Sequence, residues 1–93
     1  MECSELIFTG HAIQRIFERR ISVADVKTVI ETGQIIDTYP DDRPHPSFLL
    51  LGFRKNTPIH VVVAKDQSDG KCFIITLYIP DDMVWQPDYQ TRR

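Results

Sequence analysis

This chain of 93 residues lacks the sequence features of zinc-binding proteins, membrane-spanning proteins and basic nucleic-acid coat proteins. It has two cysteines and three histidines, with no CxxC pair and no Cys/His cluster of the kind that binds zinc. No apolar run approaches the roughly 20 residues that a membrane-spanning helix needs. Acidic residues outnumber basic ones by 13 to 11, which argues against a nonspecific nucleic-acid coat protein. We therefore expect a globular domain that uses no metal or other cofactor and binds no membrane.

The two cysteines, Cys3 and Cys72, are widely separated in the chain. Two thiols alone do not make a disulfide framework, so we expect both to be reduced and unpaired. The first residues, Met1 to Glu5, carry acids instead of the basic start of a secretory signal. Together these features predict a cytoplasmic protein.

The length predicts one domain over residues 1–93, and its first part has the pattern of helices. Thr9 is a good N-cap for a helix over Thr9–Arg20. A second helix is expected over Ser22–Thr32, because Ser22 and Asp25 have the spacing of a capping box. Gly33 is expected to end this helix in the left-handed conformation.

After the second helix the apolar pattern changes to that of strands. Three prolines between residues 40 and 46 predict an irregular loop, and the other connections are short enough for antiparallel pairing. The expected strands are Gln34–Tyr39, Ser47–Arg54, Ile59–Lys65 and Lys71–Ile79. We predict an α+β fold in which two helices pack on one face of a four-stranded, mostly antiparallel sheet. Residues 80–93 form a C-terminal tail that Trp85 is expected to anchor.

A basic row lies along the first expected helix. His11, Arg15 and Arg19 recur every four residues and therefore share one side of the helix. The apolar residues of the opposite side, which we expect to dock into the core, are Ala12, Ile13, Ile16 and Phe17. One imidazole and two guanidiniums in a row form a candidate phosphate site. A solvated face with the arginines paired to Glu18 or Asp25 is the open alternative.

A second set of polar groups lies on the last two expected strands. His60 shares one face of its strand with Val62 and Ala64, and Thr76 and Tyr78 share one face of the last strand. The same alternation places Cys72 and Ile74 on that face. A turn of three residues would set His60 opposite Tyr78, a turn of five would set it opposite Thr76, and a turn of four would separate them. A buried, hydrogen-bonded core histidine is the alternative for His60.

These groups suit cleavage of RNA without a metal. A base removes the proton of a ribose 2′-hydroxyl, cations hold the pentavalent phosphate, and an acid protonates the leaving oxygen. His11 or His60 would act as base or acid, with Tyr78 orienting or donating a proton. Arg15 and Arg19 would hold the phosphate. The further candidates for contact with the substrate are Thr76, Arg92 and Arg93.

The stretch His11-Ala12-x-x-Arg15-x-x-x-Arg19-x-Ile21 and the later Ile75-Thr76-x-Tyr78-x-Pro80-Asp81 resemble the domain-of-unknown-function 4258 family. The strand Ile59–Val63, and a tail with Trp85 before Thr91-Arg92-Arg93, fit the same pattern. The resemblance implies a two-layer fold similar to RelE/ParE-type bacterial toxins, within the wider barnase–RelE group of ribonuclease folds. It also implies a small endoribonuclease that an antitoxin protein restrains.

We therefore predict a toxin-like endoribonuclease of the messenger-RNA interferase type from a bacterial toxin–antitoxin system. Its expected partners are RNA, free or as ribosome-bound messenger RNA, and a cognate antitoxin. A non-catalytic protein-interaction module or regulatory domain with the same fold is the alternative, because fold does not fix function. A homodimer paired through an exposed sheet edge is compatible with either hypothesis.

Overall fold

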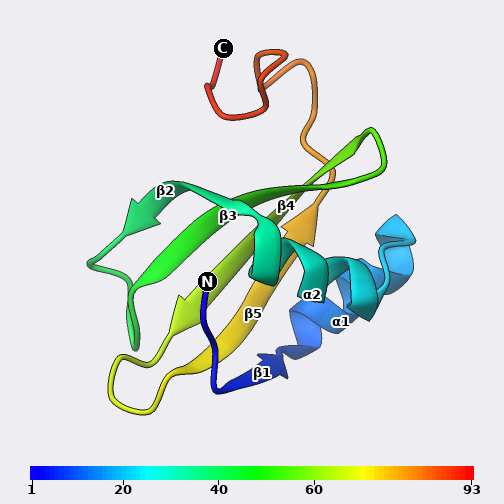
Figure 1. The fold of residues 1–93 in the computed structure, drawn as a ribbon. Helices are drawn as coiled ribbons and strands as arrows, with labels where there is room; N and C mark the ends of the chain where they lie inside the picture. Colours follow the sequence, from blue (N-terminus) through cyan, green and yellow to red (C-terminus); the bar gives the residue numbers. More distant parts are fainter.

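Two helices and a five-stranded mixed sheet form the two layers of this α+β fold (Figure 1). The computed structural model describes residues 1–93. Its elements are β1 (Glu5–Phe8), α1 (Gly10–Arg19), α2 (Val23–Thr32), β2 (Gln34–Tyr39), β3 (Ser47–Arg54), β4 (Thr57–Lys65) and β5 (Lys71–Tyr78). Both helices lie on the same side of the sheet, and the C-terminal segment extends beyond one end (Figure 1). Neither helix is long and apolar enough to cross a membrane.

The two helix starts form as the sequence predicts. The Thr9 hydroxyl accepts a hydrogen bond from the Ala12 amide at the start of α1. At the start of α2, the Asp25 amide donates to the Ser22 hydroxyl, and the Ser22 amide donates to the Asp25 carboxylate. This reciprocal pair is the predicted capping box, which is confirmed.

The helix ends differ from the prediction. Arg20, with φ 53°, is the left-handed residue that ends α1. Gly33 has φ −72°, so its predicted left-handed conformation is wrong. Glycine is needed there for close approach instead, since a Cβ atom would lie 2.4 Å from the Val29 carbonyl oxygen.

The predicted number of four strands is wrong, because β1 adds a fifth strand that runs parallel to β5. The strand order is β1-β5-β4-β3-β2, with Glu5 opposite Lys71 and Phe8 opposite Ile74. β1 has only four residues, and its partner lies at the other end of the chain, so no nearby turn marks the pairing. The predicted antiparallel pairing of consecutive strands, β2 with β3, β3 with β4 and β4 with β5, is confirmed.

A disulfide bond joins Cys3 to Cys72 and ties the N-terminus to β5. The prediction that both thiols are reduced and unpaired is therefore wrong. The reason is the missed β1, whose pairing with β5 brings the two Cα atoms to 5.6 Å, within the range of a disulfide. Disulfides are rare in reducing compartments, so the cysteines no longer support a cytoplasmic location.

Loss of this disulfide is expected to destabilise the domain. The bond joins residues 69 positions apart, and the chain-entropy estimate for a loop of that length is about 4 kcal/mol. The Cys3→Ser variant should lose roughly that much free energy of unfolding in urea. Wild-type protein in reductant should unfold at the same urea concentration as the variant. A variant as stable as the oxidised wild type would contradict the expectation.

The main core lies between the helices and the sheet. Its buried members are Ala12, Ile21, Val26, Val29, Ile30, Leu50, Ile59, Val61, Val63, Cys72, Ile74 and Leu77. α1 packs mainly on β5, and its side bearing Ala12 and Ile16 joins this cluster. Ile13 is 47% and Phe17 80% exposed, so the prediction that they dock into the core is wrong.

The turn between β4 and β5 has four residues, a length that by itself would separate His60 from Tyr78. The Asp66 amide donates to the Lys71 carbonyl at 2.9 Å, and residues 67–70 form the turn between them. Of the three turn lengths left open by the sequence, the four-residue turn is the one that forms. Pairing keeps this register as far as Val63 opposite Ile74.

A bulge in β5 then restores the predicted arrangement. The register shifts by one residue, and Ile75 has no partner on β4. Beyond the bulge Tyr78 lies directly opposite His60, the pairing expected for a three-residue turn, and Thr76 lies on the same face. The residues wrongly predicted to share that face, which instead join the helix-facing core, are Cys72 and Ile74.

Candidate functional site

The C-terminal segment, residues 80–93, folds over one end of the sheet face that carries no helix, which we call the open face. Trp85 anchors it, as predicted: its side chain is buried, and its ring meets the His60 ring edge-on at 4.6 Å. A β-bridge between Trp85 and Arg92 closes the segment on itself. A side-chain bond from Gln90 to Gln34 of β2 holds its far part.

His60 lies fully buried beneath this segment, with both ring nitrogens in hydrogen bonds. Nε2 lies 2.8 Å from the Tyr89 carbonyl oxygen, which can only accept, so Nε2 carries the proton. Nδ1 is then the acceptor for the Tyr78 hydroxyl, at 3.2 Å. Burial lowers the pKa of His60, and the charge of Arg92 acts in the same direction. The contacts are those of a neutral, buried histidine that reaches a ligand only through Tyr78.

Tyr78 stands at the border between the buried His60 and a surface pocket of about 330 Å³. Burial raises the pKa of the Tyr78 phenol, so it keeps its proton, and that proton points to His60. The oxygen's remaining lone pair is free for a ligand. The residues lining the pocket are Arg19, Tyr78, Ile79, Asp81, Val84, Trp85 and Arg92.

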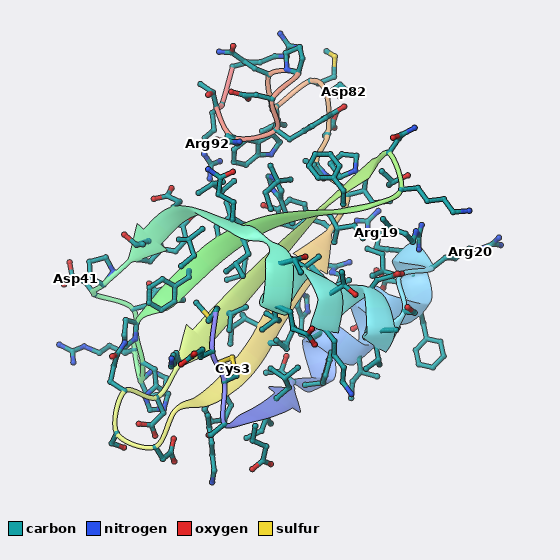
Figure 2. The ribbon with its side chains drawn as sticks, in the orientation of Figure 1. Cys3, Arg19, Arg20, Asp41, Asp82 and Arg92 are labelled. Carbon is teal, nitrogen blue, oxygen red and sulfur yellow. A yellow bond between two sulfur atoms is a disulfide. The ribbon has the colours of Figure 1, made fainter.

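Two arginines from distant parts of the sequence line this pocket, and Figure 2 labels both. Arg19 comes from the last turn of α1, and Arg92 comes from the C-terminal segment with its guanidinium 4.7 Å from the centre of the Trp85 ring. The ion pairs of the chain all involve other basic residues. Asp81 is the one carboxylate in the lining. Guanidiniums without a carboxylate partner keep their donors for an anionic ligand.

The basic row of α1 is divided between two places. Arg19 lines the pocket, whereas His11 and Arg15 do not, and they contact each other with 3.4 Å between Arg15 Nε and His11 Nε2. Arg15 also pairs with Glu18, as the solvated-face alternative predicted. The alternative pairing with Asp25 is wrong, because that carboxylate binds Arg54 at 2.9 Å.

The remaining predicted site residues lie around the pocket but not in it. Thr76 lies on the open face, two residues before Tyr78. Arg93 is held outside, where its Nε donates to the Asp82 carbonyl at 2.6 Å. The contribution of Trp85 to the pocket lining was not predicted; its being the single tryptophan of the chain is the signal that could have indicated it. No group of three or more His, Cys, Asp or Glu side chains is arranged to hold a metal ion.

Comparison with known proteins places this chain in a family. Residues 8–79 match the family described as Domain of unknown function (DUF4258). The chain belongs to this family. No curated protein and no solved structure matches the chain. The span matched to DUF4258 includes His60, Tyr78 and the basic row of α1, and it ends before Arg92.

The neutral His60 is expected to make the stability of this DUF4258 domain depend on pH. Its folded pKa lies below the unfolded value of about 6.5, so the unfolded state takes up the proton first. Stability should be constant above about pH 6.5 and should fall as the pH drops below that value toward the folded pKa. The melting temperature between pH 7.5 and 5.5 should fall more for wild type than for His60→Gln, which keeps a donor for Tyr89 without titrating. Equal losses in both proteins would contradict this cause.

Proposed function

We propose that this DUF4258 domain is a metal-independent endoribonuclease whose pocket, between α1 and the C-terminal segment, holds the scissile phosphate. The observation that supports the proposal most is that Arg19, Arg92 and Tyr78 line one surface pocket. Guanidiniums bind phosphate oxygens through two parallel hydrogen bonds and retain their charge at any physiological pH. The charge that develops on a pentavalent phosphate is therefore stabilised by groups already in position.

The proposed reaction is an internal displacement at phosphorus. The 2′-oxygen of one ribose attacks the adjacent phosphorus, and the bond from phosphorus to the 5′-oxygen of the next nucleotide breaks. The products are a 2′,3′-cyclic phosphate and a free 5′-hydroxyl. One proton leaves the 2′-hydroxyl and one arrives at the 5′-oxygen, so the reaction needs a group that takes and returns a proton.

Tyr78 and His60 form a chain that can move this proton. The Tyr78 oxygen would take the 2′-hydroxyl proton as its own proton passes to His60 Nδ1 over their 3.2 Å hydrogen bond. The imidazolium would then return a proton through Tyr78 to the leaving 5′-oxygen. The positive charge of Arg92 opposes protonation of His60, and bound phosphate would reduce that opposition. His60 is on this proposal a positioning and proton-holding residue that never contacts RNA.

Local charge makes the proposal compatible with an overall charge of −2. The first helix and its cap hold three arginines against one glutamate, Glu18. The electrostatic field at a binding site depends more on the nearby charges than on the net charge of the protein. On this proposal the domain is the toxin of a bacterial toxin–antitoxin pair, with a fold similar to RelE/ParE-type toxins, and a protein antitoxin restrains it.

The test is cleavage of RNA by the purified chain in EDTA, with and without ribosomes. Wild type is expected to cleave in at least one of these conditions, and Arg19→Ala is expected to be much slower. Arg20→Ala is the matched control, because Arg20 is the next residue and is not among the pocket-lining residues. Its side chain extends away from the C-terminal segment (Figure 2). Equal cleavage by wild type and Arg19→Ala, or no cleavage by either, would refute the proposal.

A second candidate function, a non-catalytic interaction module, is favoured by one observation. Phe17 is 80% exposed on α1, and Ile13 lies beside it one turn earlier. Exposed apolar side chains that adjoin one another are typical of protein contact sites. This candidate predicts normal bacterial growth when the chain is expressed alone, whereas the ribonuclease proposal predicts growth arrest that Arg19→Ala relieves.

A further inference from the structure

A pair of stacked rings, His45 and Phe73, lies on the open face at the end of β5 away from the pocket. Phe73 lies opposite Ala64 on this face and next to Ile7 of β1. The imidazole of His45, from the proline-rich loop, stacks on the Phe73 ring with centroids 5.5 Å apart and planes 12° apart. His45 and Phe73 are both partly exposed. Two nearly parallel rings are thus presented to solvent.

Two carboxylates lie near this stacked pair. His45 Nε2 is 3.9 Å from the Asp66 carboxylate, and Asp42, in the same loop, accepts a hydrogen bond from the Ser47 hydroxyl. The carboxylates at this end make it unsuited to a phosphate. A nucleobase is the part of RNA that carries no charge and stacks on flat rings.

The sheet surface between the two ends of the open face is long enough for a short single strand of RNA. Tyr78 and Phe73 are five residues apart on β5, which corresponds to about 16 Å. Thr76 and Val62 lie opposite each other between them, and both are partly exposed. At about 3.4 Å for each stacked nucleotide and more when unstacked, the path suits roughly three to five nucleotides.

We propose that single-stranded RNA lies along β5 and that the Phe73–His45 pair stacks one of its bases, while the pocket holds the scissile phosphate. This inference rests on the proposed ribonuclease function and names its substrate class. Thr76 lies on the path and can bond to ribose or base. A duplex would not use the pair, because its bases are already stacked and paired inside the helix.

The test compares the affinities of short and long RNA for matched variants. Fluorescently labelled oligonucleotides of two and eight residues, 2′-O-methylated to prevent cleavage, are titrated with the full chain and followed by anisotropy. The dinucleotide is too short to reach from the pocket to the stacked pair, so wild type is expected to bind the eight-mer at least about tenfold more tightly, in line with stacking of one base. His45→Ala with Phe73→Leu should lose that advantage and keep the dinucleotide affinity. Phe17→Leu, which alters an exposed ring on α1, is the control and should bind both as wild type does.

The outcomes separate this inference from the function on which it rests. Unchanged eight-mer binding by the His45→Ala/Phe73→Leu variant, or equal losses for both lengths, would overturn the stacking subsite. Duplex RNA binding as tightly as the single strand would overturn the substrate class. Arg19→Ala should weaken both lengths, and failure of wild type to bind either would refute the proposed function itself. The melting temperature of each variant identifies any loss that comes from unfolding.

Discussion

Replacing both pocket arginines, Arg19→Ala with Arg92→Ala, is expected to abolish detectable RNA cleavage while leaving the fold intact. Loss of one group that is positioned to stabilise transition-state charge typically costs about 10²–10³ in rate. Both guanidiniums would face the same phosphate, so the double variant should be slower than either single variant. Single-turnover cleavage of a labelled RNA in EDTA measures the effect.

The structural cost of these substitutions should be small. Arg19 lies outside the ion pairs, and Arg92 loses its contact with the Trp85 ring, worth about 0.5–1 kcal/mol. Arg20→Ala and Arg93→Ala are the matched controls, since each removes an arginine next to one that lines the pocket. Controls that lose as much rate as the pocket variants would mean that general positive charge, and not the pocket, supports cleavage.

Tyr78→Phe is expected to have the second largest effect. The substitution removes only the hydroxyl that links the pocket to His60, so the maximal rate should fall by about 10²–10⁴, the usual contribution of general acid–base catalysis. The KM should change little, because the arginines still hold the phosphate. The lost hydrogen bond leaves His60 Nδ1 without a donor, which costs about 1–3 kcal/mol of stability.

The pH dependence of the same variant distinguishes proton transfer from simple positioning. In wild type, acid that protonates His60 should remove its ability to accept the Tyr78 proton and so slow cleavage. The residual rate of Tyr78→Phe should not show this dependence, because the link is already absent. A Tyr78→Phe enzyme that retains wild-type rate would exclude Tyr78 from the chemistry and leave His11 as the candidate base.

Local signals in the sequence determined which parts of the fold could be predicted. Thr9, Ser22 and Asp25 cap their helices through contacts within three residues, and such contacts are encoded by short spacing. β1 and the disulfide depend on pairing with a strand more than 60 residues away, which no local pattern encodes. The exposure of Phe17 depends on where α1 sits on the sheet, and helical periodicity does not report that position.

The candidate site was predictable in its residue types more than in its assembly. His60 and Tyr78 do face each other, but a four-residue turn and a bulge at Ile75 together bring this about. The turn length was one of three left open by the sequence, and the bulge was not expected. The even spacing of the basic row suggested one site, yet only Arg19 of that row lines the pocket. The other pocket arginine, Arg92, lies in the C-terminal segment, which has no helix or strand. Residue spacing in such a segment does not predict which side chains come together.

Chemical analysis of the RNA ends after cleavage tests the central claim most directly. RNA incubated with the purified chain in EDTA, with and without ribosomes, is digested and its new ends are identified by mass spectrometry. The account predicts 2′,3′-cyclic phosphate and 5′-hydroxyl ends from wild type and Arg20→Ala, and none above background from the double variant Arg19→Ala/Arg92→Ala. Ends with a 3′-hydroxyl and a 5′-phosphate, or no new ends from wild type, would contradict it.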